Sequence, residues 1–401
     1  MKAILVLAAV AVSVYAGALK LVLLEDAAKK DGAVCLDGSA AGYYIRRAPN
    51  STGWSIYIQG GGWCYKESDC ANRATGDRGS SANWATSRGS SGAISTDKTV
   101  NPDMYDWNLV FIPYCDGASF TGDVAEPVTV DGKKIYFRGF RILKAVFNAL
   151  LNEEGMNKAE NIYLWGTSAG GLSVFQHADQ IARMVPATAR FKASPYSGVF
   201  LKSANANGKN VYPAELKYVF NMQNSSAGAH EGCLAAKAAD KKWECMFAQE
   251  ILPYVKTPIF VGNSMYDEWS TRCIFTAEPV AASSHKNGNC SAIPSWTNCM
   301  KDGTKCTDAQ IDEVNTKWGN QFLKVIKNSE TLTRNGNGYY ISSCHLHSGE
   351  NSHFNSVKIN GTTYQQALSK WFFNDNAPAA NNQYVDCMWE SDFCCNPTCC
   401  A

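Results

Sequence analysis

A serine between glycines is the feature of the chain that most directly suggests chemistry. Residues 166–170 read G-T-S-A-G and match the pattern G-x-S-x-G, with Ser168 at the centre. The run follows a strand-like stretch at 161–166 and opens a helix-like stretch at 168–184. In that setting the pattern is typical of a tight turn that presents the serine hydroxyl as a nucleophile, whereas alone it also describes an ordinary glycine-rich turn. Ser168 is therefore the predicted nucleophile.

A second glycine-rich run could supply the donors that such a nucleophile requires. Attack on an acyl carbon creates an oxyanion, which backbone N–H groups stabilise. One donor is usually the residue after the nucleophile, here Ala169, and another comes from a loop after an earlier strand. Residues 60–63, G-G-G-W, follow the strand-like stretch 55–59, so Gly62 and Trp63 are the predicted partners of Ala169. A phosphate-binding loop is the alternative, but its Gly-Lys-Ser/Thr ending is absent.

A serine nucleophile of this kind needs a carboxylate later in the chain, and then a histidine. Asp267 follows the strand-like stretch 257–263, in the position that the order requires. Glu268 is the adjacent alternative, and Asp116 precedes the serine and fits the order poorly.

Two of the six histidines lie where the order places the general base. His345 and His347 both follow the strand-like stretch 338–344. An H-x-H pair can also bind metal, but no acid-rich cluster accompanies it, so no metal site and no cofactor are expected. His177 lies too early, in the helix-like stretch after the serine, and is expected to be structural.

Strand-like and helix-like stretches alternate along the chain. The strand-like stretches are short and apolar: 19–24, 55–59, 109–114, 161–166, 191–201 and 257–263. Residues 137–154 carry apolar side chains near helical spacing. The alternation predicts an α/β-hydrolase-like fold, with a mostly parallel sheet flanked by helices. Cap-like insertions are expected near 203–250 and 274–335, over the edge where such sheets bind ligands.

The N-terminus and the cysteines predict a secreted protein. Residues 1–16 have the layout of a signal peptide, with cleavage after Ala16 or Ala18; a buried helix is the alternative. Residues 17–401 are expected to form one catalytic domain. All 16 cysteines follow the signal, which predicts disulfides, and Cys64 and Cys70 are close enough to pair. The cysteine-rich tail is expected to be stapled by disulfides, with zinc as the alternative.

Other surface features are few. Four sequons are candidate N-glycosylation sites: Asn50, Asn224, Asn289 and Asn360. The net charge is +1 and no basic block is present, so neither nucleic acid nor an anionic membrane surface is an expected partner. After the signal, no stretch has the ~18 consecutive apolar residues of a membrane span.

Seven runs of the chain, in order, resemble the pectin acetylesterase/Notum family of carboxylesterases. They are AVCLDGSAAGYY (33–44), IYIQGGGWC (56–64), NPDMYDWNLVFIPYCDGASFTGD (101–123), IYFRGFRILKAV (135–146), GTSAGGLS (166–173), NSMYDEW (263–269) and ISSCHLH (341–347). By this resemblance the nucleophile, acid and histidine are Ser168, Asp267 and His347. His345 falls where the family is usually aromatic. Thr167 and Ser348 stand where the family often has cysteine, so the disulfide pairing is expected to differ.

The resemblance implies an extracellular or cell-wall esterase that removes acetyl groups from pectin or a related polysaccharide. A Notum-like enzyme that removes a lipid acyl group from a protein is the first alternative. The two differ in the depth of the acyl pocket, and Trp63, Tyr114 and Phe120 are the expected lining in either case. The second alternative is a non-catalytic secreted glycan-binding glycoprotein, against which the complete set of serine, acid and histidine argues.

Overall fold

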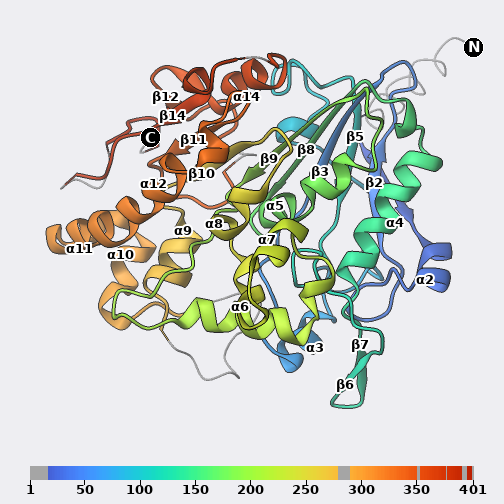
Figure 1. Ribbon diagram of the computed structural model, residues 1–401, viewed down its shortest axis with the longest axis horizontal. Helices are drawn as coiled ribbons and strands as arrows, with labels where there is room; N and C mark the ends of the chain where they lie inside the picture. The colour runs from blue at the N-terminus through green and yellow to red at the C-terminus, as the bar shows by residue number, and fades with distance from the viewer. Residues whose placement is uncertain (1–16, 279–289, 350–352, 376, 391–394, 400–401) are drawn as a thin grey trace, which may run out of the picture.

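A single large sheet organises the computed structural model, which describes residues 17–278, 290–349, 353–375, 377–390 and 395–399 (Figure 1). The predicted signal peptide, 1–16, and the sequon at Asn289 lie outside the described residues. Among the described residues, no helix is long and apolar enough to cross a membrane.

The sheet has ten strands in the order β14-β11-β10-β9-β8-β3-β5-β2-β1-β4. Their bounds are β1 Leu19–Leu23, β2 Gly42–Arg46, β3 Gly53–Ile58, β4 Ser87–Arg88, β5 Asn108–Ile112, β8 Asn161–Thr167, β9 Arg190–Tyr196, β10 Phe260–Ser264, β11 Gly338–Ser342 and β14 Gln383–Val385. Pairing is parallel from β14 through to β5 and antiparallel among β5, β2, β1 and β4. The predicted mostly parallel sheet is confirmed.

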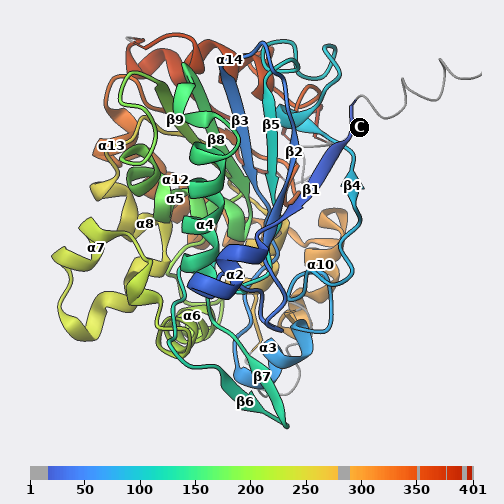
Figure 2. The same cartoon turned by 90° about the vertical axis from the view of Figure 1, so that its right-hand side faces the viewer.

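Helices cover both faces of the sheet (Figure 2). Their bounds are α2 Glu25–Asp31, α3 Glu67–Arg73, α4 Gly139–Asn152, α5 Ala169–Ala182, α6 Val211–Met222, α7 Glu231–Ala236, α8 Ala248–Ile251, α9 Glu268–Ser270, α10 Thr297–Lys301, α11 Asp308–Glu313, α12 Asn320–Lys327, α13 Glu330–Thr333 and α14 Tyr364–Phe372. Two short hairpins, β6–β7 (Val128–Val130, Lys133–Ile135) and β12–β13 (Lys358–Ile359, Thr362–Thr363), form separate two-stranded sheets.

The apolar run in β8 explains why this strand is central. Ile162 and Leu164 are buried in the core that α4 and α5 cover, whereas Tyr163 and Trp165 are buried in a second core with α14. Successive side chains of a strand point to opposite faces, so a strand buried on both faces reads as a continuous apolar run.

One strand ends earlier than its apolar run predicts. The sequence predicts an extended stretch over 191–201, but β9 ends at Tyr196. Ser197 has a φ of 46°, a left-handed backbone conformation that a strand does not contain. The chain therefore turns there and carries residues 198–201 toward the carboxyl edge of the sheet.

Both predicted insertions are largely helical. Residues 203–250 include α6 and α7, and the described part of 274–335 includes α10 and α11. The figures show α6 and α3 beyond the carboxyl ends of the central strands. A cap function for these insertions stays a prediction.

Seven disulfides link described cysteines, and among these residues no cysteine is free. The pairs are Cys35–Cys115, Cys64–Cys70, Cys233–Cys245, Cys273–Cys290, Cys299–Cys306, Cys344–Cys399 and Cys387–Cys395. Such a disulfide content fits a protein of an oxidising compartment. The tail cysteines at 387, 395 and 399 are bonded to sulfur, so they offer no thiolate to a zinc ion.

Candidate active site

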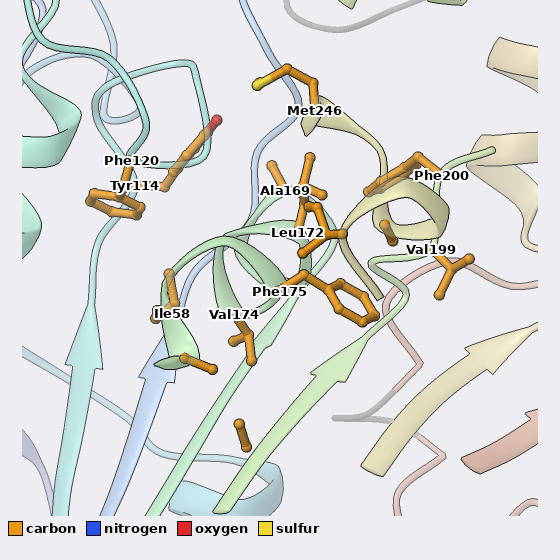
Figure 3. Close-up of a cluster of buried hydrophobic side chains, with 14 of the residues drawn as sticks. Ile58, Tyr114, Phe120, Ala169, Leu172, Val174, Phe175, Val199, Phe200 and Met246 are labelled. Atoms are coloured by element: carbon orange, nitrogen blue, oxygen red, sulfur yellow. The ribbon is translucent and has the colours of Figure 1, made fainter. Parts of the chain in front are cut away.

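Ser168 occupies the turn between β8 and α5. Its φ is 57°, in a region that residues with a Cβ rarely adopt, and its N–H donates to the carbonyl of Tyr196 at 3.0 Å. The flanking glycines are required by close packing, because a Cβ at Gly166 would lie 2.5 Å from the carbonyl oxygen of Gly170. Figure 3 shows Leu172 and Phe175 of α5 within the buried cluster that anchors this helix. The turn is therefore held from both sides.

His347 connects Ser168 to Asp267. Its Nε2 lies 2.8 Å from the Ser168 Oγ, and its Nδ1 lies 2.7 Å from the Asp267 Oδ2. Asp267 follows β10 and His347 follows β11, and these strands are parallel neighbours. The carboxyl ends of parallel strands meet at one edge, which is why residues so distant in sequence come together.

The carboxylate of Asp267 is fixed and almost completely buried. It is 1% exposed, and its Oδ1 accepts from the N–H of Ser270 at 2.8 Å while Oδ2 faces His347. The rival Glu268 points elsewhere, with 36% of its side chain exposed and Arg272 at 3.3 Å. An ionised carboxylate on Nδ1 fixes the tautomer that leaves Nε2 free to accept a proton.

His345, the alternative base, and His177, expected to be structural, make contacts with groups other than Ser168. His345 lies against the Trp389 ring, with its Nε2 3.3 Å from the Thr271 hydroxyl, and burial lowers its pKa to about 4. His177 is fully buried against Phe140, and burial also lowers its pKa to about 4. The structural role expected for His177 matches this environment.

The loop at 60–63 runs directly beside the nucleophile. A Cβ at Gly60 would lie 2.6 Å from the Cβ of Ser168. The carbonyl of Gly62 accepts from the Tyr114 hydroxyl at 2.8 Å, and that of Gly61 accepts from the Arg73 guanidinium. Gly62 has a φ of 65°, so glycine suits this position.

Three backbone N–H groups near Ser168, two in this loop and one at the start of α5, are available as hydrogen-bond donors. Within the described part of the chain, no acceptor pairs with the N–H groups of Gly62, Trp63 or Ala169. Ala169 begins α5, whose N-terminal end carries a partial positive charge. The oxyanion role expected of these three N–H groups stays a prediction.

Comparison with known proteins gives the family. The sequence model described as Pectinacetylesterase matches residues 13–400. The chain belongs to the pectinacetylesterase family. Pectin acetylesterase 11 of Arabidopsis thaliana is 33% identical, over 99% of this chain and 96% of that protein. Palmitoleoyl-protein carboxylesterase notum1a of Danio rerio is 26% identical, over 91% of this chain and 70% of that protein.

As a member of the pectinacetylesterase family, the protein is a carboxylic ester hydrolase. The elements just described agree with such an enzyme, because ester cleavage through a serine requires a nucleophile, a base and an oxyanion site.

The three residues expected to line an acyl pocket are all buried. Trp63, Tyr114 and Phe120 each have 0% exposure. Tyr114 packs against Phe120 at 5.6 Å between ring centroids, and its hydroxyl is engaged by Gly62. A substrate would reach Tyr114 or Phe120 only if the residues that bury them moved.

The aromatic residues nearest the histidine are only partly predictable from the sequence. The rings of Phe200 and Trp269 lie 6.4 and 6.2 Å from the His347 ring, and Trp63 lies 4.9 Å from Phe200. Tyr212 contacts Trp63 at 5.8 Å and Trp269 at 5.7 Å. We call Trp63, Phe200, Tyr212 and Trp269 the aromatic cluster. Trp269 lies in the predicted acid motif, but nothing in the sequence ties Phe200 or Tyr212 to it.

Proposed function

We propose that the protein is a secreted esterase that removes acetyl groups from pectin or a related polysaccharide, with Ser168, Asp267 and His347 as its catalytic residues. The observation that carries the proposal is the continuous hydrogen-bond path from Asp267 through His347 to Ser168. A path of this kind converts a weak hydroxyl nucleophile into a strong one, because the base accepts the proton as attack proceeds.

The reaction proceeds in two halves. His347 accepts the Ser168 proton while Oγ bonds to the acyl carbon, and the collapsing intermediate expels the sugar alkoxide, which takes that proton. Water then attacks the acyl-enzyme with His347 as base, and the acid leaves as Oγ regains its proton. Asp267 stabilises the imidazolium that forms in each half. The N–H groups of Gly62, Trp63 and Ala169 donate to the oxyanion in both.

The aromatic cluster favours a short acyl group. Four large rings pack on one another next to His347, and Trp63, Phe200 and Tyr212 are at most 1% exposed. A long chain would need these rings to separate, whereas an acetyl methyl requires little space. Relatives named as palmitoleoyl-protein carboxylesterases make lipid deacylation the competing substrate class.

Secretion is part of the proposal. Seven disulfides and the signal-like N-terminus support it. Of the four sequon asparagines, Asn50, Asn224 and Asn360 are exposed residues in the structure. We propose these three as glycosylated asparagines.

The test compares two p-nitrophenyl esters, acetate and octanoate, and acetate release from acetylated pectin. Ser168→Ala is the inactive variant, and Ser173→Ala is the matched control because its hydroxyl is buried in the same helix and bonds to no described group. We expect wild type and Ser173→Ala to prefer acetate and Ser168→Ala to be inert. A preference for octanoate would favour the lipid substrate class. Equal inertness of all three proteins on every ester would overturn the esterase mechanism and leave a binding protein.

A further inference from the structure

The C-terminal segment lies against the two loops that carry Asp267 and His347. The segment comprises the described residues 383–390 and 395–399, and its strand β14 pairs with β11, the strand that precedes His347. The Cys344–Cys399 disulfide joins its end to the histidine loop three residues before His347. The C-terminal segment is thus covalently bonded to the loop that carries His347.

Trp389 connects this segment to the acid loop. Its ring stacks on Tyr266, the residue before Asp267, with centroids 3.9 Å apart. The backbone N–H of Trp389 donates to the Tyr266 hydroxyl at 3.2 Å, and that hydroxyl donates to Asn315 Oδ1. The Asn315 amide returns a bond to the Trp389 carbonyl at 2.9 Å. These bonds close a ring that fixes Tyr266.

Trp389 also connects to the histidine loop. Its indole Nε1 donates to the carbonyl of Ser343 at 2.7 Å, and its ring packs in a T-shaped arrangement with that of His345, with centroids 5.5 Å apart. Asp386 binds the same loop, because its Oδ2 accepts from the N–H and the hydroxyl of Ser343 at 3.1 and 2.9 Å. Trp389 is 3% exposed, so water does not compete for these bonds.

We infer that Trp389 is a positioning residue, which holds the loops of Asp267 and His347 in the register that the catalytic hydrogen bonds require. The inference rests on the proposed function, because it assigns Trp389 a role through those two residues. One rigid side chain, stacked on Tyr266 of the acid loop and hydrogen-bonded to Ser343 of the histidine loop, restrains the two loops from moving independently. Catalysis is sensitive to such motion, since a displacement of about 1 Å can lower the rate by about 10²-fold.

The test uses Trp389→Phe and Trp389→Ala, with Trp371→Phe as the matched control. Phenylalanine keeps an aromatic ring but removes the bond to Ser343. Trp371 is also fully buried, and its Nε1 donates at 2.8 Å to the carbonyl of Gly336, before the opposite end of β11. Both Phe variants therefore lose an indole hydrogen bond near β11. Only the bond lost in Trp389→Phe is at the end of the strand that leads to His347.

We expect kcat to fall about 10-fold in Trp389→Phe and about 100-fold in Trp389→Ala, with KM little changed. The acid limb of kcat/KM, which reports the free enzyme's base, should move to lower pH in Trp389→Phe because a poorly placed carboxylate supports the imidazolium less. Trp371→Phe should leave kcat and the pH profile unchanged, whatever it does to the melting temperature. Equal kcat losses in the two Phe variants, with no change in either pH profile, would overturn the inference.

A second readout does not depend on substrate. The proton between Asp267 and His347 Nδ1 should give a far-downfield NMR resonance, assignable by its loss in His347→Gln. We expect this resonance to shift or broaden in Trp389→Phe and to persist in Trp371→Phe. If wild type hydrolyses no ester, the proposed function fails, and this resonance alone then decides the positioning role. An identical resonance in wild type and Trp389→Phe would contradict that role.

Discussion

The Oδ2 of Asp267 lies 2.7 Å from the Nδ1 of His347, although the two residues are 80 positions apart. The contact exists because adjacent parallel strands end together, and because Asp267 is held in place by the Ser270 N–H of the short helix α9. It leaves the imidazole with one orientation, in which Nε2 faces the Ser168 hydroxyl. The neighbouring carboxylate, Glu268, contacts Arg272 instead. Substitutions can therefore distinguish the contribution of Asp267 to catalysis from that of Glu268.

Asp267→Asn should lower kcat by about 10³- to 10⁴-fold, because an amide favours the wrong imidazole tautomer and cannot stabilise the imidazolium. Glu268→Gln changes the adjacent, partly exposed carboxylate, whose contact is with Arg272. That change should alter kcat by less than about two-fold, since exposed ion pairs contribute little. Initial rates on p-nitrophenyl acetate provide the measurement. Similar losses in both variants would mean that Asp267 is not the acid of the site.

Tyr114→Phe should loosen the loop at 60–63. The hydroxyl donates to Gly62 and accepts from the N–H of Ser119 at 2.9 Å. Removal of the hydroxyl leaves the buried Gly62 carbonyl and Ser119 N–H without this hydrogen-bond partner. The loss should lower the free energy of unfolding by about 1–3 kcal/mol. Displacement of the loop should also lower kcat by about 10-fold, less than the loss of a whole oxyanion donor.

Tyr340→Phe provides the comparison for this experiment. Tyr340 is buried, and its hydroxyl donates to the carbonyls of Val357 and Thr362, each at 3.0 Å, on the other core of the sheet. Urea unfolding should show losses of the same order in both variants, whereas only Tyr114→Phe should lose kcat. Unchanged kcat in a destabilised Tyr114→Phe would show that Gly62 does not need this anchor.

The parts of the site that the sequence predicted share one property. Ser168, Asp267 and His347 each come after a strand that is recognisable from its apolar run, and parallel strands carry the residues at their carboxyl ends to one edge. The chain order of the three residues then matches the order expected of such a site. Because the topology of the sheet brings the three residues together, local sequence patterns were sufficient to predict them.

The parts that the sequence did not reveal depend on tertiary packing. Phe200 reaches the aromatic cluster because the chain turns at Ser197, directly after β9, and Tyr212 reaches it from the inserted helix α6. The last strand, β14, has only three residues, none of them fully buried, so its composition does not distinguish it from a loop. Trp389 lies in a tail whose cysteines indicate disulfides, and no local pattern there marks the tryptophan.

A last prediction concerns Asp116, a carboxyl that is 1% exposed. Its Oδ2 accepts from the N–H groups of Ala118 and Phe120 at 3.1 and 2.8 Å, and Oδ1 is buried without a hydrogen-bond partner among the described residues. Burial raises the pKa of Asp116 to about 6, against the opposing effect of these bonds and of Arg73. In an unfolded chain the pKa of an aspartate is about 3.9.

The sign of the pH effect is set by these values. Well below about pH 3.9 the carboxyl is protonated in both the folded and the unfolded state, so it adds no pH dependence. As pH rises further, the unfolded chain loses a proton that the folded protein retains, and stability falls until the folded carboxyl also ionises near pH 6. A shift of about two pKa units corresponds to a loss of about 3 kcal/mol at neutral pH.

Asp116→Asn should abolish this loss, because the amide oxygen can still accept the two N–H groups and no charge is buried. The free energy of unfolding, from urea titrations at pH 4.5 and 7, should decline less in Asp116→Asn than in wild type by about 2 kcal/mol. Asp131→Asn, at the exposed turn between β6 and β7, should retain the wild-type decline. If Asp116→Asn declines as steeply as wild type, then the Asp116 carboxyl does not hold its proton in the folded protein at pH 4.5.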